Sequence, residues 1–298
     1  MAEVRVLASE GEKRPIRVRL RNLFDALKLH ESLFALPFAY TGMFLASGGW
    51  PTLHSFVWIT LAMVGARNFG MAMNRVIDKA IDAANPLNKG RHVPSGRTKE
   101  WEMVALSIVA LLLLMVSAWQ LNPLAFVLAW PAAAYLVLYS YTKRFTWASN
   151  LTLGGALAIG PAGAWIGVTG AFSGQMVLLW AVVFLWASAF DILYHLPSRD
   201  FYIQHGLHSV PQKFGIRTAI MWARVHDVLA IAALAALGVW MGLNFPYFIG
   251  VASAAAVLGY KHTLVSSKDL SRLGAAFFRY NVLVSALIFI FTVIAVLI

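Results

Sequence analysis

The segment from Trp101 to Arg144, WEMVALSIVALLLLMVSAWQLNPLAFVLAWPAAAYLVLYSYTKR, decides the fold of this chain. It holds two apolar runs, 102–119 and 124–142, which a turn-forming Asn-Pro pair separates. Each run is close to the roughly 20 residues that a helix needs to cross the hydrocarbon core of a bilayer. The segment therefore predicts two transmembrane helices joined by a short loop.

The same pattern continues over all 298 residues. Only 12% of them are charged, against about 25% in soluble domains, and the mean hydropathy is +0.70. These values predict an all-α polytopic membrane protein, with residues 29–298 forming one transmembrane domain behind a basic tail, residues 1–28. The tail lacks an apolar stretch, so we do not expect a cleavable signal peptide. The nine expected spans are 29–47, 55–73, 102–119, 124–142, 150–170, 176–196, 218–240, 245–261 and 275–298.

The net charge of +11 follows the expected topology rather than a nucleic-acid surface. With nine spans, all 24 Lys and Arg residues fall on one side of the membrane, which is the positive-inside pattern. This predicts a protein of the cytoplasmic membrane, with the N-terminus in the cytoplasm and the C-terminus on the opposite side. The basic residues are expected to meet anionic lipid, and no nucleic-acid partner is predicted. The absence of cysteine excludes disulfide and thiolate chemistry.

A first polar cluster follows the second span. Arg67, Gly70, Asn74, Asp78 and Asp82 are spaced by three or four residues, which places them on one face of a helix. Two carboxylates four residues apart repel each other unless a cation lies near them. Oxygen ligands without Cys or His are typical of Mg²⁺, which proteins hold through one or two carboxylates and substrate phosphates. The cluster predicts a Mg²⁺ site beside an anionic substrate.

Basic residues near this cluster are candidates for phosphate contacts. Arg75 lies beside the polar face, and Lys89, Arg91 and His92 follow in the loop 74–100. Lys143 and Arg144 end the fourth span, either as topology anchors or as a clamp on phosphate oxygens.

A second polar cluster begins at the inner end of the sixth span, in DILYHLPSRDFYIQHG, residues 191–206. Helical spacing puts Tyr194, His195, Ser198 and Tyr202 on the face of Asp191, although a proline interrupts the helix and leaves Asp200 unplaced. The histidine spacing does not match a zinc site. Elsewhere, the Gly163/Gly167 pair in the fifth span predicts either close helix packing or a cavity wall.

Together these motifs resemble the UbiA superfamily of intramembrane prenyltransferases. The first aspartate-rich motif is similar to NRVIDKAID (74–82) with RHVPSG (91–96) after it, and the basic end of span 4 is similar to YTKR (141–144). The second motif is similar to DILY (191–194) with GLHSVPQKFG (206–215). The wording of the second motif and of KLHESLFALPF (28–38) resembles the 4-hydroxybenzoate polyprenyltransferase-like branch, which includes enzymes of the futalosine route to menaquinone.

The resemblance implies nine helices around a central cavity, capped by two cytoplasmic polar loops. It implies Mg²⁺-dependent transfer of a prenyl group from a prenyl diphosphate to an aromatic acceptor, as in ubiquinone or menaquinone biosynthesis. Residue by residue, it implies that Asn74, Asp78 and Asp82 hold one Mg²⁺, that Asp191 belongs to a second, and that Arg67 and Lys143 contact diphosphate. We also expect substrate contacts from Arg75, Arg91, Arg144, Tyr194 and Asp200. Phe69, Trp186 and Tyr194 are candidates for contact with an allylic cation.

The second motif departs from the family pattern, which has aspartates where Ser198 and Tyr202 stand here. Either Asp200 replaces them, or the second metal is held weakly through water and phosphate. An alternative interpretation of the sequence is a protein that binds prenyl lipids without catalysis. A secondary transporter is a poorer one, because its charges typically lie at broken helices in mid-membrane. Donor chain length, acceptor identity and oligomeric state do not follow from the sequence.

Overall fold

The structure is a computed structural model that describes residue 25 and residues 36–298, except 89, 90, 92, 268, 269, 271, 272 and 274. Every regular element within these ranges is a helix, as predicted. Expectations for the basic tail other than Asp25, for residues 29–35, and for Lys89 and His92 lie outside the described residues.

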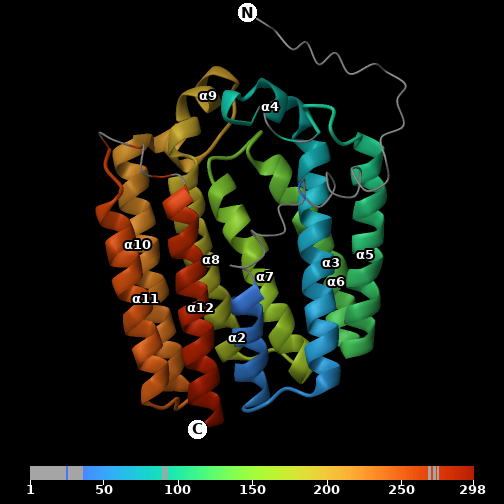
Figure 1. Cartoon of the computed structure of the whole chain (residues 1–298), viewed down its shortest axis with the longest axis vertical. Coiled ribbons are helices and arrows are strands. Elements are labelled where there is room, and N and C mark those ends of the chain that lie inside the picture. The colour runs from blue at the N-terminus through green and yellow to red at the C-terminus, as the bar shows by residue number, and fades with distance from the viewer. Residues whose placement is uncertain are drawn as a thin grey trace, which may run out of the picture.

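The long helices run beside one another, and short helices cover one end of the bundle (Figure 1). Each predicted span from residue 55 onward overlaps one long helix. The long helices are α2 (Leu36–Ser47), α3 (Leu53–Ile77), α5 (Glu100–Leu121), α6 (Pro123–Thr142), α7 (Ser149–Thr169), α8 (Gly174–Tyr194), α10 (Val210–Trp240), α11 (Phe245–Thr263) and α12 (Ala275–Leu297). The short ones are α4 (Lys79–Ala84), η2 (Pro86–Asn88), η3 (Leu196–Ser198) and α9 (Arg199–Gln204).

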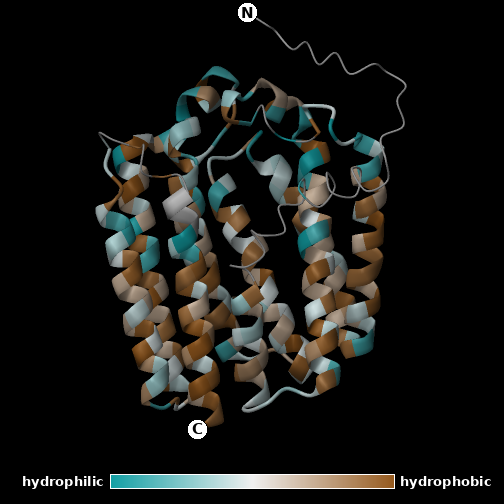
Figure 2. Cartoon of the chain, viewed as in Figure 1, coloured by the Kyte–Doolittle hydropathy of each residue, from teal (hydrophilic) through white to brown (hydrophobic). Residues whose placement is uncertain are grey.

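The outer faces of the long helices are apolar, while hydrophilic residues gather at the end that carries α4 and α9 (Figure 2). Large apolar side chains such as Val109, Leu112 and Val127 are about three-fifths exposed, which is stable only against lipid. In the described chain, seven helices are long and apolar enough to cross a membrane. The described part of α2 is too short to be counted among them, and α11 does not meet the same criteria of length and hydropathy. Nine membrane crossings therefore stay a prediction.

The hairpin predicted from the opening segment is present as α5 and α6. Asn122 forms its turn: its side-chain oxygen accepts from the Ala125 amide at 2.8 Å and caps α6. Its amide group donates to the Ile166 carbonyl at 2.8 Å, which fixes the loop to the end of α7. These contacts satisfy backbone groups that helix termini leave open.

Helices α7 and α8 approach each other closely at Gly154. A Cβ atom there would lie 2.1 Å from Ser188 Oγ and 2.6 Å from the Phe184 carbonyl oxygen, so only glycine fits. About two and a half turns further along α7, Gly163 has nothing within 4 Å of its Cβ position, and it lines the central cavity. For Gly163 the structure therefore favours the cavity wall. At Gly167 an added Cβ atom would lie 3.0 Å from Leu121 and 3.3 Å from Ile59, so this glycine serves close helix packing.

Candidate active site

A cavity of about 980 Å³ lies within the bundle, and its lining changes character along its length. Away from α4 and α9 the walls are mainly alanine, glycine and aliphatic residues from α3, α5, α6 and α7. Toward the end covered by α4 and α9 the lining is polar. The polar lining residues of the cavity include Arg67, Asn74, Arg75, Asp78, Asp82, Asn85, Asn88, Arg91, Tyr139, Lys143, Asp191, Tyr194, His195, Ser198 and Tyr202.

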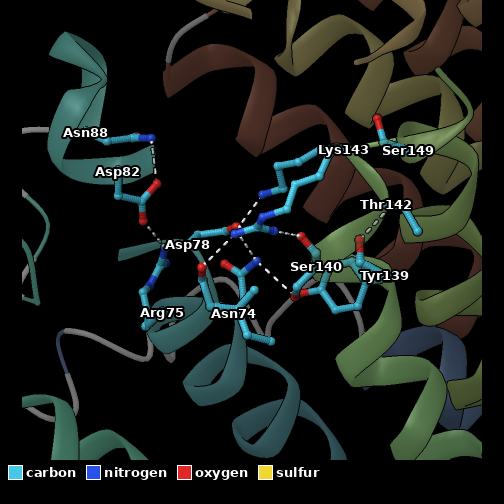
Figure 3. Close-up of polar contacts among 12 residues, drawn as sticks. Asn74, Arg75, Asp78, Asp82, Asn88, Tyr139, Ser140, Thr142, Lys143 and Ser149 are labelled. Atoms are coloured by element: carbon cyan, nitrogen blue, oxygen red, sulfur yellow. Dashed lines mark hydrogen bonds and ion pairs between the residues drawn. The ribbon is translucent and has the colours of Figure 1, made fainter. Parts of the chain in front are cut away.

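The first cluster meets the end of α6 (Figure 3). Asp78 is the junction between α3 and α4, so the predicted helical face bends at this residue instead of continuing on one helix. Its Oδ2 accepts hydrogen bonds from Asn74 Nδ2 at 2.7 Å and from Lys143 Nζ. Asn74 Nδ2 also donates to Ser140 Oγ at 3.1 Å, and Arg144 Nη1 lies 3.4 Å from Asp78 Oδ1. One buried carboxylate thus has two cationic neighbours.

Arg144 itself does not line the cavity. Its guanidinium donates to the carbonyl oxygens of Ile77 at 2.7 Å and Ser140 at 2.9 Å, which joins α6 to α3 behind the site. The structure therefore places Lys143 at the cavity and Arg144 in the supporting wall.

Asp82 lines the cavity from α4, next to the Asp78 cluster. Arg91 Nη1 lies 2.6 Å from both of its carboxylate oxygens, Asn88 Nδ2 donates to Oδ1 at 3.0 Å, and Arg75 Nη1 is 3.9 Å from Oδ2. The side chain of Asp82 is only 4% exposed, so the ion pair with Arg91 compensates the cost of burying the charge. Arg67 lines the cavity deeper along α3.

The donor chemistry of this first cluster fits a divalent cation. Asp78 Oδ1 is buried and accepts no hydrogen bond from the described residues, and the Asn74 carbonyl oxygen is open because its amide nitrogen makes the protein contacts. Such oxygen ligands suit Mg²⁺. No three His, Asp or Glu side chains converge anywhere in the described chain, so a cation here would need oxygens from another source, as diphosphate supplies.

The second cluster is arranged differently. Asp191 is 6% exposed, and its Oδ2 accepts a hydrogen bond from Asn150 Nδ2 at 2.8 Å and lies 3.3 Å from His195 Nδ1. Asn150 Oδ1 accepts from the Val210 amide at 2.9 Å, which links α7, α8 and the start of α10. Burial lowers the pKa of His195, but the Asp191 carboxylate raises it by more, so the pKa lies above its usual value.

Ser198 and Tyr202, which stand where the second motif of the family has aspartates, both line the cavity. Tyr202 is 6% exposed, and burial, reinforced by Asp191 and Asp78, raises the pKa of its hydroxyl, so it stays a neutral phenol. Asp200 does not line the cavity: its side chain is 84% exposed and pairs with Arg199 at 3.2 Å. This placement gives no support to the prediction that Asp200 replaces the missing carboxylates.

Three contacts of the site were not apparent from the sequence: Asn150, Ser140 and Asn88. Asn150 bonds Asp191 and Ser140 bonds Asn74 across long sequence separations, while Asn88 bonds Asp82 six residues away. The one sequence signal that could have identified Asn150 is its position as a polar residue at the end of a predicted span. Of the aromatic candidates, Tyr194 lines the cavity, whereas Phe69 and Trp186 pack in the core and do not.

Fold and site together define a class: a polytopic membrane protein whose apolar cavity opens at one end onto acidic, amide and basic side chains. Such a cavity suits a lipid with an anionic head group. Residues 35–283 match the UbiA prenyltransferase family, and the chain belongs to that family. It is therefore an integral membrane enzyme of the prenyltransferase type.

Individual relatives agree with this membership. The chain is 32% identical over 256 residues to the 4-hydroxybenzoate octaprenyltransferase of Methylobacillus flagellatus, and this alignment covers 83% of each chain. It is 32% identical over 272 residues to the enzyme of that name from Paraburkholderia phymatum, covering 86% of this chain and 89% of the relative.

Solved structures show the same fold. A UbiA homologue from Aeropyrum pernix K1, solved in the apo state, superposes with a TM-score of 0.81 at 28% identity, covering 89% of this chain and 98% of the other. A homologue from Archaeoglobus fulgidus bound to GPP and Mg²⁺ has a TM-score of 0.73 at 18% identity, covering 92% and 99%. Divalent metal therefore occurs in structures of this fold.

Proposed function

We propose that this protein transfers a prenyl group from a prenyl diphosphate to an aromatic acceptor, 4-hydroxybenzoate or a related quinone precursor, in a Mg²⁺-dependent reaction. The observation that carries the proposal is the pairing of Asp78 with Lys143 at the polar mouth of an apolar cavity. The acceptor is inferred from the relatives, which are named 4-hydroxybenzoate octaprenyltransferases.

Asn74, Asp78 and Asp82 would hold the metal. Bound there, Mg²⁺ supplies Lewis-acid neutralisation of the leaving diphosphate. Lys143 and Arg91 line the same mouth, and Arg67 lines the cavity deeper along α3. Their cationic groups bind diphosphate oxygens directly and stabilise the charge that develops on them. This set positions the head group while the apolar walls receive the prenyl chain.

In the transfer step, the C1–O bond of the donor breaks and its electron pair leaves with the diphosphate. An electron-rich carbon of the acceptor ring forms a new bond to C1, and the proton on that carbon passes to the released diphosphate. Water must be kept from the allylic cation, and the alanine- and glycine-rich wall around Gly163 disfavours it.

For orientation in the membrane, we propose that the end carrying α4 and α9 faces the cytoplasm. The positive-inside distribution supports this, because the segment 74–100 at that end contains the basic residues 75, 79, 91, 97 and 99. The anionic donor would then enter from the cytoplasmic side. Membrane lipid is the expected surrounding.

A purified sample with Mg²⁺, 4-hydroxybenzoate and a prenyl diphosphate tests the proposal, with the prenylated acid detected by mass spectrometry. Product should form in wild-type protein, should disappear with a chelator, and should fall at least a hundredfold in Asp78→Asn, as is typical when a catalytic electrostatic contact is lost. Turnover unchanged in Asp78→Asn would refute the metal assignment.

A second candidate function is prenyl-lipid binding without catalysis. It is favoured by one observation, that Ser198 and Tyr202 provide no carboxylate. Mg²⁺-dependent release of diphosphate separates the two functions, because a binding protein retains the donor intact.

A further inference from the structure

The wall opposite Asp78 is the poorer metal site of the two, because one carboxylate lines it where the Asp78 wall has two. Its cavity-lining carboxylate is Asp191, and that group is already engaged by Asn150 Nδ2 at 2.8 Å and His195 Nδ1 at 3.3 Å. Ser198 and Tyr202 add a hydroxyl and a neutral phenol, and Asp200 points away to Arg199. With Oδ2 engaged, only Oδ1 of Asp191 remains as a charged ligand atom for a cation on this wall, among the described residues.

The hydrogen-bond chain instead fixes the orientation of His195. Because Asn150 Oδ1 accepts from the Val210 amide, its Nδ2 is the atom that faces Asp191. His195 Nδ1 lies 2.9 Å from the backbone carbonyl of Asp191, and a carbonyl oxygen only accepts. Asn150 Nδ2 also lies 3.2 Å from Nδ1, but its shorter contact, 2.8 Å, is to Asp191 Oδ2. When the ring is neutral, its hydrogen is therefore on Nδ1, with the Asp191 carboxylate as a second acceptor.

This arrangement leaves Nε2 for a ligand. No hydrogen bond to Nε2 is made by any residue within the described ranges, and His195 lines the cavity with its side chain 22% exposed. Tyr194 and Tyr202 flank the ring, with centroids 5.6 and 5.5 Å away. A planar aromatic ligand in the cavity beside these rings would present a polar substituent to Nε2.

We propose that His195 forms a hydrogen bond through Nε2 with the hydroxyl group of the aromatic acceptor, and that Asp191 and Asn150 are positioning residues for His195 rather than metal ligands. The inference rests on the proposed function for the kind of acceptor. It assigns the two walls of the cavity different tasks: the Asp78 wall binds metal and diphosphate, and the Asp191 wall recognises the acceptor.

Ligand pairs that differ by one hydroxyl test the contact. The probes are 4-hydroxybenzoate against benzoate, and a hydroxynaphthoate against the corresponding naphthoate, bound to protein loaded with Mg²⁺ and a non-hydrolysable prenyl diphosphate analogue. Wild-type protein should prefer the hydroxylated member of at least one pair by roughly three- to tenfold, the usual size of one neutral hydrogen bond. His195→Phe should lose the preference, and His195→Gln should regain part of it.

Metal counting tests the role of Asp191. With the analogue bound, Mn²⁺ titration followed by electron paramagnetic resonance should give the same number of ions in wild type and Asp191→Asn. Asp78→Asn is the positive control and should lose affinity. Asp191→Asn should nevertheless weaken the hydroxyl preference, because an amide holds His195 less well.

Three results would overturn the inference: loss of an ion in Asp191→Asn, an unchanged preference in His195→Phe, or no preference for any pair in wild type. Weaker binding of the analogue itself in His195→Phe would also contradict it, since that would put His195 on the diphosphate. These readouts measure binding, so they stand even if the protein transfers no prenyl group, which would refute the proposed function alone.

Discussion

Lys143, the residue that ends α6, forms an ion pair with Asp78, the residue that joins α3 to α4. Asp78 is 1% exposed and Arg144 lies 3.4 Å from its other oxygen, so one negative charge faces two positive ones. The excess positive charge is fixed in a largely buried place, where screening by salt is weak. This relationship prepares the cavity mouth for a further anion.

Replacing Lys143 with methionine should weaken binding of a non-hydrolysable prenyl diphosphate analogue by roughly 10- to 100-fold, because a charge-assisted hydrogen bond is lost. Isothermal titration calorimetry in the presence of Mg²⁺ measures this. The protein should stay folded, since Asp78 keeps Asn74 and Arg144 as neighbours.

Lys79→Met is the matched control. Lys79 pairs with Glu100 at 2.9 Å, but both side chains are about half exposed, and such surface pairs contribute little. Equal losses in the two variants would mean that only net charge matters and would contradict a specific contact by Lys143.

The contact between Arg91 and Asp82 predicts that Arg91 and a bound metal ion compete for the Asp82 carboxylate. In the structure its guanidinium contacts both carboxylate oxygens at 2.6 Å, the atoms that a metal would use. Without diphosphate, Arg91→Gln should therefore bind Mn²⁺ several-fold more tightly than wild type, because a competing charged hydrogen bond is removed. With the diphosphate analogue present the order should reverse, since Arg91 then has the phosphate to contact.

Mn²⁺ titration with and without the analogue checks both halves of this prediction. Asp82→Asn should bind the ion more weakly in both conditions. If Arg91→Gln weakens Mn²⁺ binding even without diphosphate, Arg91 supports the metal site and does not compete with it.

The sequence allowed the apolar spans, the hairpin of α5 and α6 and the polar face of α3 to be predicted, because these depend on local periodicity. The partners of the polar residues could not be predicted in the same way. Asn150 bonds Asp191 across 41 residues and Ser140 bonds Asn74 across 66, and neither spacing carries a pattern. Such contacts depend on how the helices are arranged around the cavity.

Two details depended on backbone geometry that composition does not reveal. The apolar run predicted a span beginning at residue 218, but α10 already begins at Val210. Gly215, with a φ of 80°, separates this first short turn from the rest of the helix. The turn at Pro197 carries Asp200 away from the cavity, so nearness in sequence to Asp191 was a poor guide to its position.

A buried ionic cluster away from the cavity makes a prediction about stability. Lys261 Nζ donates to Asp227 Oδ2 at 2.7 Å and His262 Nε2 lies 2.8 Å from the same oxygen, with Lys261 and Asp227 at most 3% exposed. Lys261→Met should destabilise the protein by about 3–5 kcal/mol, because it removes the cationic partner of a buried carboxylate. Thermal unfolding in detergent measures the loss.

The double variant Asp227→Leu/Lys261→Met should recover most of this stability, since no unpaired charge remains. Recovery of less than half the loss would mean that packing, rather than charge, dominates at this contact between α10 and α11. Donor and acceptor affinities should be unchanged in the double variant.

Gly163 links the fold to the length of the donor chain. Its Cβ position is open and faces the cavity, so Gly163→Leu should place a side chain within the apolar part without a clash in the packing. The remaining cavity should hold a long prenyl chain less well, and kcat/KM should fall at least tenfold for a long donor while changing little for a ten-carbon one. Gly259, on the exposed side of α11, also has nothing within 4 Å, and Gly259→Leu is the matched control. Product analysis across donors of increasing length measures the effect, and an equal fall for short and long donors in Gly163→Leu would show that the prenyl chain takes another path.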